Sequence, residues 1–306
     1  MSKFSESNTK AGRFLARNSG KLISGLKHEV IAKVYRSSRF RALSRKFYKP
    51  KEPEKWVFLV GCYNSGTTIL RRLLESHPDI AAFPAEGVTM TDAFPNMEAG
   101  GYPRMMYANR HLWDEPIDNS KERADMAKRD WARWWPKDAK VYMEKSIDHS
   151  IRMAWLDENF PNAYFIFIVR NGYCVSEGIR RRARPLGAAA TKLGDCYSVE
   201  MVAEQWKAIN AKIEEDGEKI SRFHKVRYED LMEDPILNLR TIFRFLDLEI
   251  PPLTTNRDSV IVDGIAHQIL NQNKKSISRI TTKDLDEMSK ILGDSLAHYG
   301  YRNLTD

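Results

Sequence analysis

The positions of apolar residues predict buried strands that alternate with helices after residue 50. Residues 56–60 (Trp-Val-Phe-Leu-Val) and 163–169 (Ala-Tyr-Phe-Ile-Phe-Ile-Val) are continuously apolar runs, as expected of strands buried on both faces. Residues 224–228 predict a third strand. Helices are expected over residues 67–76, 175–184, 198–219 and 236–246. Strands separated by helices indicate right-handed crossovers, and therefore an α/β fold with a central parallel sheet flanked by helices.

The first fifty residues differ from the rest in pattern. Apolar residues recur at helical spacing between Leu22 and Val34, with Lys and Arg on the other faces. Such a basic amphipathic helix suits an anionic membrane surface, a transit peptide or a helix docked on the body of the protein. Residues 49–53 (Lys-Pro-Lys-Glu-Pro) break any helix. We therefore expect residues 1–50 to form an arm and residues 51–306 to form the main domain.

The distribution of charge changes the meaning of the net charge of +8. Residues 1–50 hold 13 Lys and Arg against two acids, which leaves 36 basic and 39 acidic residues and a net −3 for the main domain. The basic character therefore belongs to the arm, and we expect no nucleic-acid partner. No apolar run approaches the roughly 20 residues of a membrane span.

The three cysteines, Cys62, Cys174 and Cys196, lack the spacing of a disulfide framework or a metal site. The arm also lacks the continuous apolar segment of a secretory signal. These features predict a protein without a metal cofactor that works in the reducing cytoplasm. Peripheral membrane contact through residues 1–50 is the open alternative.

Residues 61–68, Gly-Cys-Tyr-Asn-Ser-Gly-Thr-Thr, join the first predicted strand to the first predicted helix. Backbone N–H groups and the positive end of the helix would surround an anion in such a loop. The glycine spacing matches the first half of a P-loop, but Thr67 stands where a nucleotide triphosphatase has Lys, which disfavours a kinase. The alternative is an ordinary turn in which Ser65 or Thr67 caps the helix.

Residues 65–68 (Ser-Gly-Thr-Thr) and 77–79 (His-Pro-Asp) resemble the sulfotransferases that use 3′-phosphoadenosine 5′-phosphosulfate (PAPS), especially the tyrosylprotein and carbohydrate branches and their bacterial relatives. The resemblance spans residues 55–302 and implies a P-loop-like three-layer sandwich. It also implies that the 5′-phosphosulfate is bound by Asn64, Ser65, Gly66, Thr67 and Thr68. The family often has Arg or Lys where this chain has Asn64, so a cation expected near the sulfate is absent from the loop.

Two further segments resemble the nucleotide-binding motifs of this family. Residues 167–171 (Phe-Ile-Val-Arg-Asn) imply that Arg170 grips the 3′-phosphate, for which a planar guanidinium is well suited. The family's 3′-phosphate serine corresponds to Gly178, so Ser176, backbone amides or the arginines at 180–182 would replace it. Residues 225–235, which begin Lys-Val-Arg-Tyr, imply that Tyr228 lies beside the nucleotide, and a tyrosine buried in the core is the alternative.

The resemblance also implies two catalytic residues. Residues 142–146 (Tyr-Met-Glu-Lys-Ser) resemble the segment whose lysine reaches the transferred group, so Lys145 would neutralise the bridging oxygen as the nucleotide leaves. Glu86, in Pro-Ala-Glu-Gly, corresponds to the catalytic glutamate that follows the His-Pro pair, and would accept the acceptor proton. His77 is the rival base.

We therefore expect in-line transfer of a sulfuryl group from PAPS to a hydroxyl acceptor: a glycan, a tyrosyl peptide, a lipid or a small alcohol. The irregular segments 84–140 and 185–198 would select the acceptor. Trp131, Trp134 and Trp135 recur at helical spacing, which favours a packed helix face over a sugar-stacking surface. A non-catalytic nucleotide- or anion-binding module, tethered by its basic arm, is the alternative function.

Overall fold

The structure is a computed structural model that describes residues 37–136 and 139–305. The helix predicted between Leu22 and Val34 lies outside the described residues. Within the described residues, no helix is long and apolar enough to cross a bilayer.

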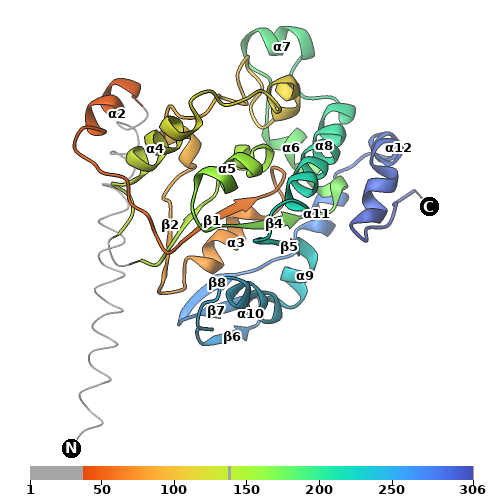
Figure 1. Ribbon diagram of the computed structural model, residues 1–306. Coiled ribbons are helices and arrows are strands. Elements are labelled where there is room, and N and C mark those ends of the chain that lie inside the picture. Colours follow the sequence, from red (N-terminus) through yellow and green to blue (C-terminus); the bar gives the residue numbers. More distant parts are fainter. Residues whose placement is uncertain (1–36, 137–138, 306) are drawn as a thin grey trace, which may run out of the picture.

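Five parallel strands form the central sheet, in the order β2-β3-β1-β4-β5 (Figure 1). They are β1 (Lys55–Val60), β2 (Ile80–Ala82), β3 (Val141–Glu144), β4 (Ala163–Val169) and β5 (Phe223–Arg227). β1 pairs with β3 on one side and with β4 on the other, so it is the middle strand of the sheet. The loop after β1 therefore starts at the middle of the carboxyl edge of the sheet. The parallel sheet and its three predicted strands are confirmed, whereas β2 and β3 are additional.

Alternate side chains of the central strands pack into two separate cores. Trp56 and Phe58 of β1 face one core, and Val57 and Leu59 face the other. Five helices contribute to the first core: α4 (Ser120–Trp131), α5 (Met153–Asn159), α6 (Gly172–Arg182), α8 (Val199–Gly217) and α12 (Thr282–His298). The second core receives α3 (Thr67–Leu74), α9 (Tyr228–Glu233) and α10 (Pro235–Phe245). Helices therefore cover both faces (Figure 1), and the predicted three-layer sandwich is confirmed.

A second, antiparallel sheet contains β6 (Leu253–Asn256), β7 (Ser259–Val262) and β8 (Ile265–Gln268). It packs on the second core through buried Val260 and Val262. Asp263 and Gly264 form the turn between β7 and β8, with φ angles of +47° and +78°. The predictions from sequence do not include this sheet, although an Asp-Gly pair between alternating apolar residues is a hairpin signal.

Short helices occupy the segments that the sequence presents as irregular. They are η1 (Gly87–Met90), η2 (Met106–Leu112) and α7 (Gly187–Leu193). Two further short helices, η3 (Ile147–Ile151) and α11 (Asn273–Ile277), lie outside these segments. The tryptophans do not share one helix, because α4 ends at Trp131. Trp131 and Trp135 are nevertheless buried in the first core, which confirms packing over sugar stacking for these two residues.

Helix α2 (Ser38–Ser44) belongs to the predicted arm but contacts the main domain. Arg41 and Arg45 both form ion pairs with Asp92, and Arg45 also pairs with buried Asp130 of α4 at 2.8 Å. Burial alone would raise the pKa of Asp92, but hydrogen bonds from the two guanidinium groups lower it to about 2. The end of the arm thus binds the segment that follows β2.

We expect Asp92→Asn to destabilise the protein at neutral pH but not in strong acid. The pKa of Asp92 is lowered from 3.8 to about 2 by folding, so its contribution is complete above pH 3.8 and is lost as the pH falls toward 2. Urea unfolding of the native and substituted proteins at several pH values measures this difference. Asp247→Asn, which removes an exposed partner of Lys55, is the control and should change little. A difference that persists unchanged at the lowest pH would contradict the prediction.

Candidate active site

Two glycines shape the loop between β1 and α3. Gly61 has a φ of +153° and Gly66 a φ of +108°, both in a region that favours glycine. A Cβ atom would lie 2.5 Å from the carbonyl oxygen of Ile168 at Gly61, and 2.6 Å from the ring of Tyr228 at Gly66. The loop is therefore pressed against both β4 and the residue that follows β5.

The first turn of α3 is open to an anion. The Ser65 hydroxyl donates to the carbonyl oxygen of Cys62 at 2.7 Å, and Gly66, the N-cap residue of α3, has no side chain with which to cap the helix. The first N–H groups of a helix have no partner within it, so those after Gly66 are free to bind an anion. Ser65 is fully buried and does not line the cavity described below, so its side chain shapes the loop instead of facing a ligand.

A cavity of about 700 Å³ lies beside this loop, within the size range of ligand sites. The predicted residues that line it are Asn64, Gly66, Thr67, Thr68, Glu86, Lys145, Arg170 and Tyr228. Lys145, Arg170 and Tyr228 each directly follow a strand of the central sheet. The carboxyl ends of parallel strands meet at one edge, which is why residues so distant in sequence lie together.

Arg170 is fixed in the cavity wall by three contacts. Its Nη1 donates to the backbone oxygen of Asn64 and its Nε to Oδ1 of Asn273, both at 2.9 Å. The guanidinium also lies 4.4 Å from the centre of the Tyr228 ring. Among the described residues, Nη2 has no partner although it is buried. Tyr228 is itself buried, donates to the carbonyl oxygen of Leu270 at 3.1 Å and still lines the cavity, so it is a core tyrosine, and its place beside a nucleotide stays a prediction.

A smaller cavity of about 210 Å³ adjoins Arg170 between α6 and α11. Four more basic residues line it: Arg181, Arg182, Lys275 and Arg279. Lys275 and Arg279 are not among the predicted site residues, because no motif marks the segment that holds them. Ser176 lies in α6, is fully buried and lines neither cavity, so the structure does not bring this predicted residue into the site.

Glu86 and Lys145 form an ion pair, with 2.5 Å between Oε1 and Nζ, at the wall of the main cavity. Buried Glu144 links the segments that carry them, because it accepts hydrogen bonds from the N–H groups of Gly87 at 2.6 Å and Ser146 at 3.0 Å. Burial would raise the pKa of Glu144, but nearby His149 and these hydrogen bonds lower it. Glu144 thus holds together the two segments that carry the pair.

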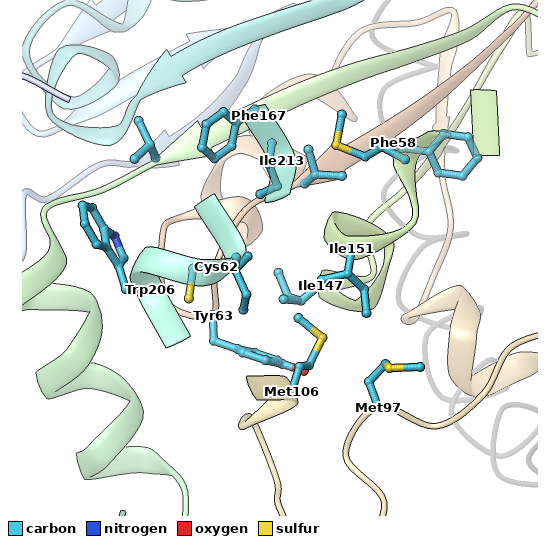
Figure 2. Packing of buried hydrophobic residues seen from close by; sticks show 14 of the residues in the cluster. Phe58, Cys62, Tyr63, Met97, Met106, Ile147, Ile151, Phe167, Trp206 and Ile213 are labelled. Atoms are coloured by element: carbon cyan, nitrogen blue, oxygen red, sulfur yellow. The ribbon is translucent and has the colours of Figure 1, made fainter. Parts of the chain in front are cut away.

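Tyr63 and Glu98 form another wall of the cavity, and buried Asp148 lies behind them. The Tyr63 hydroxyl donates to Glu98 at 2.6 Å and to Asp148 at 3.3 Å. Burial raises the pKa of Asp148 to about 6, despite the charge of Arg152. Figure 2 shows Tyr63 in the first core, next to the loop residue Cys62. This wall is therefore continuous with the packed interior.

His77 does not line either cavity. Its Nε2 donates to the backbone oxygen of Glu249 at 2.8 Å, and its Nδ1 accepts from the N–H of Asp79 at 3.1 Å. Both ring nitrogens of His77 are thus engaged in hydrogen bonds with the backbone, and this rival base lies away from the site. Among residues 37–136 and 139–305, no group of His, Cys, Asp and Glu is arranged to hold a metal ion.

The model of the sulfotransferase family matches residues 57–252, which include the loop, Glu86, Lys145, Arg170 and Tyr228. The chain belongs to the sulfotransferase family. The resemblance inferred from the motifs is therefore confirmed.

Sequence relatives of this sulfotransferase-family chain come from animals and bacteria. Protein-tyrosine sulfotransferase 1 of Danio rerio is 23% identical over 246 residues, which cover 78% of this chain and 65% of that protein. Omega-hydroxy-beta-dihydromenaquinone-9 sulfotransferase of Mycobacterium bovis is 31% identical over 113 residues, 36% of this chain and 29% of that protein. The chain thus spans less than two thirds of the length of these relatives.

The sulfotransferase fold is also found by comparison with solved structures. The crystal structure of a sulfotransferase from Mycobacterium avium has a TM-score of 0.51 and 14% sequence identity, and the match covers 85% of this chain and 79% of that one. At this identity the likeness concerns the fold alone, and it agrees with the three-layer arrangement of the central sheet.

We expect Glu144→Gln to destabilise the site, because the Glu144 carboxylate binds the two segments that carry Glu86 and Lys145. An amide has one acceptor oxygen instead of two, so a buried N–H of Gly87 or Ser146 would lose its partner, at a cost of about 1–3 kcal/mol. Chemical denaturation measures the lost stability. Glu215→Gln, which alters an exposed carboxylate of α8 that pairs with Lys219 of the same segment, is the control. A Glu144 variant as stable as the native protein would contradict the anchoring role.

Proposed function

We propose that this chain transfers a sulfuryl group from PAPS to a hydroxyl-bearing acceptor by in-line displacement. The observation that carries the proposal is one cavity in which an uncapped helix start, the Arg170 guanidinium and the Lys145–Glu86 ion pair face the same space. Membership of the family supports this reaction class. The ion pair favours an enzyme over a non-catalytic binding module, because anion binding alone needs no carboxylate.

The donor nucleotide would lie across both cavities. The N–H groups after Gly66 suit the 5′-phosphosulfate, and Arg170 with Arg181, Lys275 and Arg279 of the smaller cavity suits the 3′-phosphate. An unpartnered buried donor costs about 1–3 kcal/mol. A phosphate oxygen that accepts from Nη2 of Arg170 would remove this cost, which supports an anion at this position.

Lys145 and Glu86 would change partners during the reaction. In the free protein they bind each other, so neither is available. As the acceptor oxygen forms its bond to sulfur, the bond between sulfur and the bridging oxygen breaks and negative charge develops on the leaving nucleotide. Lys145 would donate to that bridging oxygen, and the released Glu86 carboxylate would accept the proton of the acceptor hydroxyl.

The reaction class is tested by incubating the purified protein with radiolabelled PAPS and, separately, with radiolabelled ATP, against glycan, tyrosyl peptide, lipid and small-alcohol acceptors. We expect transfer of label from PAPS to one acceptor class and none from ATP. Transfer from ATP alone would overturn the proposal. Tight binding of adenosine 3′,5′-bisphosphate without transfer to any acceptor would favour the non-catalytic module.

We expect Lys145→Ala to lower turnover by roughly 10²–10³-fold, because it removes the charge that stabilises the leaving oxygen. Affinity for adenosine 3′,5′-bisphosphate should change only a few-fold, since Lys145 acts on charge that develops during transfer. Glu86→Gln should show the same division between turnover and binding. Lys140→Ala, at the exposed amino end of the same strand, is the matched control. Unchanged turnover in the Lys145 variant would contradict its role.

We expect Lys275→Ala to weaken binding of adenosine 3′,5′-bisphosphate by about 10-fold, as for a lost hydrogen bond between charged groups. Binding of adenosine 5′-phosphate, which lacks the 3′-phosphate, should stay the same. Lys274→Ala is the matched control, because Lys274 lies on the same helix and lines neither cavity. Isothermal titration calorimetry measures both affinities, and an equal loss for the two nucleotides would contradict a 3′-phosphate site.

A further inference from the structure

Asn64 stands in the phosphate loop where the family often has a cation, and two arginines from other segments converge on it. Nη1 of Arg182, at the end of α6, lies 2.9 Å from Oδ1 of Asn64. Nη1 of Arg104, between the strands β2 and β3, lies 3.4 Å from the same oxygen. Both arginines line the main cavity.

No ion pair of Arg104 or Arg182 is found in the described part of the chain, and Glu177, the carboxylate that acts on Arg182, is itself paired with Arg181. A guanidinium has only donors, so the Asn64 atom that it meets is the carbonyl oxygen, which orients Arg104 and Arg182 without neutralising them. Neither forms an ion pair with a described carboxylate; their side-chain hydrogen bonds go to Asn64. Burial lowers the pKa of Arg182, and the charges of Arg181, Arg104 and Arg170 lower it further. Such mutual repulsion is relieved when an anion binds between the cations.

The backbone around this cluster is adapted to asparagine. Asn64 has a φ of +64°, a conformation that asparagine tolerates better than lysine or arginine. A Cβ atom at Gly178 would approach the Cβ and Cγ atoms of Asn64 to 3.2 Å, so the absent side chain at 178 leaves room for the amide. Asn64 and Gly178, the two departures from the family pattern, therefore fit each other.

Arg104 is held from outside the cavity. The Tyr197 hydroxyl donates to the backbone oxygen of Pro103, and Nε2 of Gln205 donates to that of Arg104, each at 2.9 Å. The backbone N–H of Leu186 donates to the oxygen of Gly101 at the same distance. The chain before η2 is thus fastened to the segment around α7 and to α8, which fixes the start of the Arg104 side chain.

We propose that Arg104 and Arg182, oriented by the Asn64 carbonyl, bind the 5′-phosphosulfate and supply the positive charge that the loop itself lacks. This inference rests on the proposed use of PAPS. Two guanidinium groups beside the uncapped start of α3 would meet the negative charge of the transferred group and of the phosphate next to it. The positive charge thus comes from Arg182 at the end of α6 and from Arg104 in the segment after β2, instead of from position 64 of the loop.

The test compares adenosine 3′,5′-bisphosphate with adenosine 3′-phosphate, which lacks the 5′ group, by calorimetry. In the variant Arg104→Ala/Arg182→Ala we expect affinity for the bisphosphate to fall by about 10- to 100-fold, as for lost charged hydrogen bonds. Affinity for adenosine 3′-phosphate should change less than about twofold, within ordinary context effects. Asn64→Ala alone should lower bisphosphate affinity, and should add little in the variant that already lacks both arginines.

Arg110→Ala, which removes an exposed arginine from η2 outside both cavities, is the matched control and should leave both affinities unchanged. Equal thermal melting temperatures of the variants would show that the fold is kept. Native binding with an unchanged preference for the bisphosphate in the double variant would overturn this inference alone. Native protein that binds neither nucleotide would instead contradict the proposed function.

Discussion

The parallel pairing of the central sheet is the constraint on which the site depends. Parallel strands end at the same edge, so every loop that leaves a strand there contributes to one cavity. β1 lies in the middle of the sheet and is followed by the loop that precedes α3. The strands β3, β4 and β5 end directly before Lys145, Arg170 and Tyr228. The pairing of Phe58 with Glu144 and of Val169 with Arg227 therefore places a lysine, an arginine and an aromatic ring around the loop.

Buried polar groups connect this edge to the interior. Glu144 is completely enclosed, yet its oxygens bind the N–H groups that follow Glu86 and Lys145. Arg170 serves similarly on the other side of the loop, through the backbone oxygen of Asn64. Because a buried charge is costly unless its hydrogen bonds are made, these residues hold the surrounding chain in one arrangement. The cavity is consequently preorganised by the core below it.

The positive charge of the cavity comes from several parts of the chain. Arg182 ends α6, Arg104 lies in the segment that follows β2, and Lys275 lies in α11. The main domain carries a net negative charge outside the arm, so this local cationic character reflects placement and not composition. Contacts between the segments near Gly101 and Leu186 bring two of these contributors to the same wall.

The sequence by itself determined the α/β class, three of the central strands, the loop between β1 and α3 and eight of the residues that line the cavity beside it. Continuous apolar runs and the glycine spacing are local patterns, because they depend only on residues that are close together in the sequence. Tertiary structure decided what depends on distant pairs: the short strands β2 and β3, the exclusion of Ser176 and His77, and the convergence of Arg104 and Arg182 on Asn64. The contact partner of an exposed arginine cannot be predicted from the local sequence, because it depends on how elements far apart in the chain pack together.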